Sequence, residues 1–313
     1  MQSKRLEFEN FKGSFVTHGI DVIEDPKQAD AVYIFAVNHL LNPDHWEASE
    51  GAEETPKARS QIELFRHVLQ SDTVQHVRSI RHPLIQTPND IYAVNPQSFY
   101  VTNDHFYREG VGRVVESTLP IAKWSTTIHV QINDLKNAKD ATAGIEASVA
   151  LDGLWTNNGL GHGRTDQEIV ISSPIGGELY VSQWHESNKS ISVQATIPFE
   201  TVTDNPSYYA DPYRTESDDA SGLVVAGISQ GYYLEKSAKD PNSTEASQVW
   251  YARPQKGSDA WETKLLFEDD GSRIRSASAA VLVPIEPKDG LKRAWLFVTG
   301  FLSESMIAVQ VQL

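Results

Sequence analysis

The sequence predicts an all-β fold of the propeller type. Short runs rich in β-branched and aromatic residues are separated by turn residues at spacings of roughly 8 to 15 residues, a pattern shared by sandwiches, barrels and propellers. A coarser repetition of the same pattern, at roughly 50 to 60 residues, favours propeller blades, since a blade is a unit of about four strands. Helical periodicity is weak throughout.

The expected strands, in chain order, are His76–Ile80, Ile91–Val94, Phe99–Thr102, Thr126–Ile132, Glu168–Ser172, Leu179–Gln183, Ser190–Ala195, Leu223–Ile228, Val249–Ala252 and Leu296–Gly300. Two stretches are weak helix candidates. Ala48–Glu63 is charged and predicts a solvated loop or a short helix, whereas Asn205–Asp219 is rich in turn formers.

Five blade-like units are expected, beginning near Gly13, Pro88, Glu146, Glu200 and Ser272. The last unit offers only three strands, at Ala277–Val283, Arg293–Gly300 and Met306–Val311. A final blade that lacks a strand usually borrows one from the N-terminus, but the first dozen residues are a poor candidate. We therefore expect a single propeller domain over residues 1–313 whose ring is open or imperfectly closed, with the last unit three-stranded or patched by residues 1–12.

Composition excludes several classes of function. The chain has 313 residues, of which 40% are hydrophobic, so it can bury a large core, and its net charge of −15 argues against nucleic acid or an acidic membrane as a partner. It contains no cysteine, which excludes disulfides, thiolate nucleophiles and zinc–thiolate sites. No apolar run approaches about 18 residues, and the charged N-terminus does not resemble a signal peptide.

The stretch Asn89–His105 concentrates the chemistry. Two short strands are joined by a turn at Asn95-Pro96, and an Asn-Asp pair lies at one end of each strand, at Asn89-Asp90 and at Asn103-Asp104. Oxygen atoms gathered at strand ends suit a hard cation, and calcium takes about six to eight of them. The alternative is that Asn-Asp pairs merely begin turns.

Similar polar groups recur in other units, at His18-Gly-Ile20, Asn38-His39, Asn157-Asn158-Gly159 and Asp204-Asn205. Equivalent ends of propeller blades converge on the central channel, so residues about 50 apart in sequence can meet at one ion. Asparagine amides bind a cation through oxygen without the repulsion among several carboxylates. A mixed Asn and Asp site therefore fits Ca²⁺.

These motifs resemble the calcium-dependent paraoxonase/arylesterase family of six-bladed propellers. The similarity is strongest in His18-Gly-Ile, Val37-Asn-His39 and the run from Arg78 to Phe106, which includes Ile80-Arg-His-Pro-Leu-Ile85 and Phe99-Tyr-Val-Thr-Asn-Asp-His105. It extends from about Phe15 to the C-terminus and weakens after Asp134.

The resemblance implies two calcium sites and a histidine pair. Asn89, Asn158, Asp204 and Asn205 match ligands of a catalytic calcium, and Asp90 and the carbonyl of Ile20 match ligands of a structural calcium. His18 and His39 match the pair associated with hydrolysis. The implied substrates are small aryl esters or lactones, and the implied location is the secretory pathway.

The departures from the family pattern also matter. An adjacent Glu-Asp pair that serves both ions is expected well upstream of His18, and neither Glu7 nor Glu9 supplies it. A later Cys-His pair is replaced by Gly227-Ile-Ser229. The chain therefore resembles an N-terminally shortened member that lacks the first blade and the closing strand, and its exposed strand edges predict self-association.

The chemistry expected on physical grounds is hydrolysis. Calcium with an open position would polarise an ester or lactone carbonyl, His18 could take a proton from water, and His39 could orient or relay it. Each histidine could instead simply cap a strand end. A serine-hydrolase Gly-x-Ser-x-Gly motif is absent, and Gly159–Gly163 lacks the features of a phosphate loop, so we expect an ordinary loop there.

Two functions remain open: a calcium-dependent ester or lactone hydrolase, and an inactive propeller fragment or scaffold that has lost part of its site. If the missing carboxylates weaken calcium binding, activity should be weak and should require high calcium.

Overall fold

The computed structural model describes residues 4–47, 55–136, 140–229, 231, 234–258 and 260–313. Residue contacts divide the chain into two compact units, Met1–Asn157 with Asn188–Ser190, and Asn158–Ser187 with Ile191–Leu313. Each unit is described by itself.

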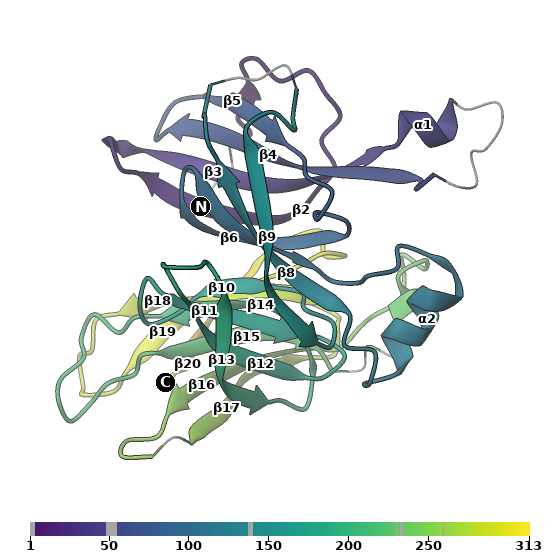
Figure 1. Cartoon of the computed structure of the whole chain (residues 1–313). Helices are drawn as coiled ribbons and strands as arrows, with labels where there is room; N and C mark the ends of the chain where they lie inside the picture. The colour runs from purple at the N-terminus through teal and green to yellow at the C-terminus, as the bar shows by residue number, and fades with distance from the viewer. Residues whose placement is uncertain (1–3, 48–54, 137–139, 230, 232–233, 259) are drawn as a thin grey trace. The chain divides into compact units, whose positions relative to one another are not determined.

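The first unit contains two sheets and two helices (Figure 1). Its elements are β1 Glu7–Phe8, β2 Thr17–Asp25, β3 Gln28–Leu41, α1 Pro43–Trp46, β4 Ala58–Val68, β5 Thr73–Ile80, β6 Pro88–Asn95, β7 Ser98–Asn103, α2 Gly110–Thr118, β8 Ser125–Ile132 and β9 Ile145–Leu154. Strands β2 to β5 form one antiparallel meander, and β6 to β9 form the other.

The second unit contains three further groups of strands. Its elements are β10 Leu160–His162, β11 Glu168–Ser173, β12 Glu178–Trp184, β13 Ile191–Pro198, β14 Val202–Tyr209, β15 Gly222–Ile228, α3 Leu234–Ser237, β16 Ser247–Pro254, β17 Trp261–Asp269, β18 Ala277–Ile285, β19 Arg293–Gly300 and β20 Ile307–Gln312. Strands β10 to β13 and β14 to β17 are four-stranded antiparallel meanders, and β18 to β20 form a three-stranded one. One parallel pair, Asn205 opposite Ala279, joins β14 to β18.

The all-β expectation is confirmed. All ten strands that the sequence predicts fall on strands of the structure, and the described residues form four four-stranded meanders and a final three-stranded one. The turn at residues 96–97 is also confirmed. One boundary was wrong, because Glu146 belongs to β9, the last strand of the second meander, and the third meander begins at Leu160.

Three local expectations were wrong. Ala58–Glu63 begins β4 and is not a solvated loop, because the charge of Glu63 is fully buried and is satisfied by His76 and Ser79; residues 48–54 of that stretch lie outside the described residues. Asn205–Tyr209 continues β14, so only residues 210–219 form the expected turn-rich segment. Leu160–His162 forms β10 within the expected loop.

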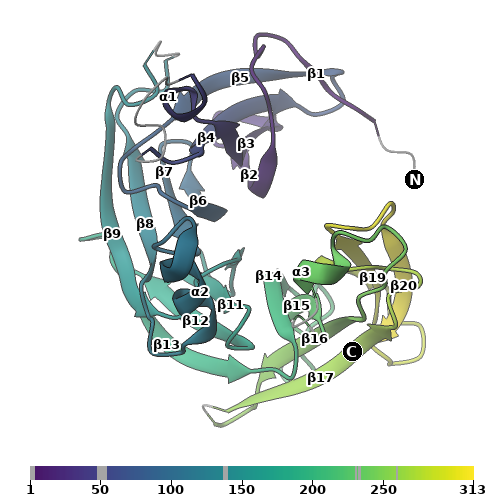
Figure 2. The same ribbon diagram turned by 90° about the vertical axis from the view of Figure 1, so that its right-hand side faces the viewer.

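The N-terminal segment covers the first sheet. Glu7 and Phe8 pair in parallel with Thr73 and Val74 of β5, and Figure 2 shows β1 beside β5. The ring of Phe8 lies 5.3 Å from that of Phe65, which Phe11 and Phe15 also contact. The last meander therefore keeps three strands in the structure, and the described part of residues 1–12 extends the first sheet instead.

Buried aliphatic and aromatic side chains hold the meanders together within each unit. In the first unit the core includes Phe35, Ile62, Ile91, Phe99 and Ile128, each 2% exposed or less. Complete burial of such a side chain contributes about 1.5–3 kcal/mol. The second unit has two such clusters, around Val170 and Val225 and around Val249 and Leu296.

The first strand of each meander carries an irregularity near its N-terminal end. Register shifts place His18-Gly19, Asn89-Asp90, Asp204-Asn205 and Ser278 in bulges of β2, β6, β14 and β18. Just before β10, the N–H of Asn158 donates to the carbonyl of Ser172, and the N–H of Ser172 donates to the carbonyl of Gly159. Two consecutive residues, Asn158 and Gly159, therefore lie opposite the single residue Ser172, as in a β-bulge. Bulges redirect side chains and are frequent beside functional sites. Most of the polar motifs in the sequence therefore lie in a bulge that recurs near the start of each meander.

Candidate functional site

The two predicted histidines lie together in the first unit. Nδ1 of His18 is 3.2 Å from Nε2 of His39, and Nδ1 of His39 is 2.8 Å from Oγ of Ser60. His39 does not cap the end of its strand: β3 continues to Leu41, and His39 lies directly opposite Ser60 of β4. The side chain of Asn38 also stays inside, where it donates to Glu63.

The tautomers of this chain of hydrogen bonds decide what it can do. If His39 donates its Nδ1 proton to Ser60, its Nε2 accepts from Nδ1–H of His18, which leaves Nε2 of His18 without a proton. That nitrogen has no hydrogen-bond partner among the described residues and can accept a proton from water. The opposite direction would leave Nε2 of His18 protonated and unable to act as a base.

The surroundings keep both imidazoles neutral near pH 7. Partial desolvation lowers the pKa of His18 below 6.5, and the charge of Asp104 opposes this shift. Desolvation and the neighbouring His18 lower the pKa of His39, again against Asp104. Burial alone would raise the pKa of Asp104, but the nearby His105 and Arg113 outweigh it and lower that pKa.

A pocket of about 330 Å³ opens on the histidine pair. Its lining residues all belong to the first unit and are His18, His39, Lys57, Ala58, Ser60, Gln86, Thr87, Pro88, Asp104, Arg108, Glu109 and Arg113. Most of these residues are polar or charged, and one of them, Pro88, directly precedes Asn89 in the sequence.

The predicted oxygen ligands of the first unit meet the His-Gly-Ile motif. A Cβ atom on Gly19 would overlap the carbonyl oxygen of Asn89 and Oδ1 of Asp90, so only glycine permits this approach. Asn89 and Asp90 are about 5% and 4% exposed and lie within β6, not before it as the sequence suggested. Ile20 directly follows the bulge of β2 and lies opposite Ala36 of β3.

The second unit repeats this arrangement with other side chains. A Cβ atom on Gly159, next to Asn158, would lie 2.8 Å from Oδ1 of Asn205 and 3.0 Å from the carbonyl oxygen of Asp204. Nδ2 of Asn205 donates to Oγ of Ser278 at 3.0 Å. Burial raises the pKa of Asp204 to about 7, and a hydrogen bond with Ser278 lowers it only in part.

These donor sets fit a hard cation. They offer amide, carboxylate and backbone oxygens, the ligands that calcium prefers, and a neighbouring cation would stabilise the charged form of a desolvated carboxylate such as Asp204. No group of three or more His, Cys, Asp or Glu side chains able to hold a metal occurs among the described residues, and a site built on Asn and backbone oxygens does not require one. The two sets belong to different units, and their convergence on one ion stays a prediction.

Several functional candidates escaped the sequence analysis. Ser60, Arg108 and Arg113 line the pocket, and Ser278 contacts Asn205. Nothing in their sequence context distinguishes them, because cross-strand partners and bulge positions depend on long-range pairing. Asp104 had a signal, since it belongs to the Asn103-Asp104 pair.

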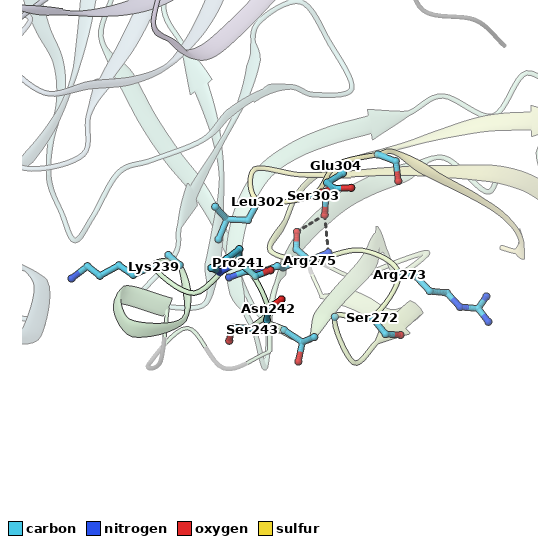
Figure 3. A pocket seen from close by; sticks show the side chains of 14 residues that line it. Lys239, Pro241, Asn242, Ser243, Ser272, Arg273, Arg275, Leu302, Ser303 and Glu304 are labelled. Carbon is cyan, nitrogen blue, oxygen red and sulfur yellow. Dashed lines mark hydrogen bonds between the residues drawn. The ribbon is translucent and has the colours of Figure 1, made fainter.

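The larger pocket of Figure 3, about 740 Å³ in the second unit, offers no comparable chemistry. Its Arg275 is committed to Glu245 and to the carbonyl of Ser237, while Lys239 and Arg273 point in opposite directions. None of its lining residues is a histidine.

In the described part of the chain, no helix is both long and apolar enough to cross a membrane.

Comparison with known proteins agrees with the motifs. The family model described as Arylesterase matches residues 5–285. Serum paraoxonase/arylesterase 2 of Gallus gallus is 26% identical over 86% of this chain and 64% of its own length, and the Homo sapiens protein of that name is 26% identical over 75% and 55%. Serum paraoxonase/lactonase 3 of Oryctolagus cuniculus is 22% identical over 89% of this chain and 67% of its own. The chain thus spans less than two thirds of the length of the first two relatives. Since the family model matches residues 5–285, which is most of the sequence, this chain belongs to the arylesterase family.

Proposed function

We propose that this chain hydrolyses aryl esters and lactones, with His18 as general base and calcium held by oxygen atoms of the bulges. The observation that supports it best is the hydrogen-bonded series His18–His39–Ser60 on the wall of a pocket. The relatives named paraoxonase, arylesterase and lactonase support the substrate class.

His18 would carry the proton transfer. Nε2 of His18 takes one proton from a water molecule as the hydroxide oxygen forms its bond to the carbonyl carbon. When the tetrahedral intermediate collapses, the same proton returns from Nε2 to the leaving alkoxide or phenoxide, so that ester and water become acid and alcohol. His39 accepts from Nδ1 of His18, and Ser60 accepts from His39, which together keep the ring in the competent tautomer.

Calcium, when bound, would supply a Lewis acid that polarises the carbonyl and stabilises the oxyanion. By resemblance, Asn89, Asn158, Asp204 and Asn205 would hold the catalytic ion. Asp90 and the carbonyl of Ile20 would hold the second, structural ion.

The test compares wild type with His18→Gln, using phenyl acetate and an aliphatic lactone, in millimolar calcium and in excess chelator. We expect activity only for wild type with calcium, and a loss of roughly 10²-fold or more in the variant, since general base catalysis contributes that much. Ser192→Ala is the matched control, because Ser192 also lies within hydrogen-bond distance of a histidine, His185, but neither residue belongs to the proposed site. Equal rates in all samples would favour the alternative, an inactive propeller fragment or scaffold.

A further inference from the structure

The pocket beside the histidine pair is richer in positive charge than the chain as a whole. The chain carries a net charge of −15, yet the pocket collects three cations, Lys57, Arg108 and Arg113, against two carboxylates, Asp104 and Glu109. Because His18 and His39 are neutral near pH 7, the excess of one positive charge comes from the long side chains.

Two of the three cations already have acidic partners. Nζ of Lys57 lies 2.6 Å from Oε2 of Glu109, and Nη2 of Arg113 lies 3.7 Å from Oδ2 of Asp104. Each of these pairs lies on the pocket wall, so neither presents an uncompensated charge to a ligand.

Arg108 is different. Its Nε donates to the carbonyl oxygen of Gln86 at 3.0 Å, and no acidic group among the described residues forms an ion pair with it. This one bond anchors the guanidinium to the wall and leaves the N–H groups of both terminal nitrogens available. Desolvation lowers the pKa of Arg108, as expected for a cation without a counter-charge. A planar guanidinium with free terminal nitrogens matches a carboxylate or phosphate in bidentate geometry.

The geometry points to a substrate that carries its own negative charge: we infer that Arg108 binds an anionic group of a small ester or lactone whose carbonyl lies at His18. Both side chains line one pocket, whose volume of about 330 Å³ is near the low end of ligand sites, roughly 300–1,000 Å³. This volume is sufficient for a single aromatic or lactone ring. This inference rests on the proposed hydrolase function for the position of the carbonyl, but the anion site itself does not.

A binding experiment tests the anion site without catalysis. 4-Acetamidobenzoate and 4-acetamidobenzamide have nearly the same shape, but the first carries a carboxylate where the second carries a neutral carboxamide. Calorimetry in excess chelator removes any contribution from bound calcium. We expect wild type to bind the carboxylate at least about tenfold more tightly than the carboxamide, because hydrogen bonds to charged groups contribute that much. Arg108→Gln should abolish the difference, and Arg108→Lys should keep only part of it.

Arg59→Gln is the matched control. Arg59 lies on β4 between two pocket residues but does not line the pocket, and it faces Asp44 at 3.9 Å. The control should keep the full preference for the carboxylate. A wild type without preference, or an Arg108→Gln variant that retains it, would overturn the inference.

Kinetics with 4-acetoxybenzoate and phenyl acetate, in calcium, then separate the two proposals. Arg108→Gln should lower kcat/KM for the anionic ester by a factor about tenfold or more larger than the factor for the neutral ester. If wild type hydrolyses neither ester while the carboxylate preference persists, the hydrolase proposal fails and the anion site stands. If both esters are hydrolysed and Arg108→Gln affects them equally, the specificity role of Arg108 is refuted.

Discussion

In both units a glycine packs against a β-bulge, but the side chains beside the glycine differ. In the first unit Gly19 approaches the bulge at Asn89-Asp90, and in the second Gly159 approaches the bulge at Asp204-Asn205. The residue before the glycine is His18 in one case and Asn158 in the other. The first arrangement includes a hydrogen-bonded histidine pair, and the second includes the carboxyl group of Asp204, whose pKa is raised by desolvation.

This difference indicates a division of labour. The glycine and the bulge allow two backbone segments to approach closely. In the proposed function, the neighbouring side chains determine whether the site transfers a proton or binds a cation. The proposed ligands of the catalytic ion come from both units, since Asn89 belongs to the first unit and Asn158, Asp204 and Asn205 belong to the second. Four predictions test it.

Replacement of Asp204 should have the largest effect. Asp204→Asn removes the charged ligand of the proposed catalytic site, and we expect calcium affinity to fall by about two to three orders of magnitude, since ligand charge tunes affinity. His39→Gln should leave calcium affinity unchanged, because His39 contacts His18 and Ser60 and no proposed ligand. Calorimetric titration with calcium measures both. Similar losses in the two variants would contradict the division.

Replacement of Gly19 and of Gly159 by alanine compares the two glycine–bulge contacts directly. Gly19→Ala should lower the free energy of unfolding by about 3 kcal/mol, because its Cβ would overlap backbone and side-chain atoms of β6. Gly159→Ala should cost less, about 1–2 kcal/mol, since its nearest contact is 2.8 Å away. Gly13→Ala is the control, because its Cβ meets only the ring of Phe11, at 3.2 Å. Urea unfolding measures the free energy of unfolding of all three variants. A larger loss of stability for Gly159→Ala than for Gly19→Ala would contradict this prediction.

The calcium-free protein should lose stability as the pH rises. Burial raises the pKa of Asp204 from 3.8 to about 7, so between these values the unfolded chain releases a proton that the folded chain keeps. The contribution is therefore lost from about pH 4 to 7, and we expect a decrease of about 2 kcal/mol after allowance for partial exposure. Unfolding in chelator at several pH values measures it. Asp204→Asn should flatten the dependence in this window, and calcium should remove it in wild type; an unchanged slope in the variant would exclude this origin.

The smallest effect concerns the first unit alone. Hydrolysis should require neutral His18, so kcat/KM should rise with pH through a pKa below 6.5. Asp104 raises the pKa of both histidines, and Asp104→Asn should therefore move the rising limb to lower pH. The pH profile of phenyl acetate hydrolysis measures the shift. A limb that moves to higher pH would mean that Asp104 does not act through its charge.

Much of this protein was determined by its sequence alone. Short runs of β-branched and aromatic residues between turn formers located the predicted strands, because such side chains pack well on a pleated sheet. The polar pairs marked the bulges, and the run from Arg78 to Phe106 identified the family. Where the sequence was misleading, burial was the reason: Glu63 looks like a surface charge but lies inside a complete hydrogen-bond network.

Only the tertiary structure decided which side chains meet. Ser60 contacts His39 because β3 and β4 pair in one register, and Ser278 contacts Asn205 because β18 lies parallel to β14. Arg108 lines the pocket because Gln86, from a different loop, accepts its hydrogen bond. These contacts join residues that are 21, 73 and 22 positions apart. No local pattern encodes such pairs, since strand register is fixed by the packing of whole sheets.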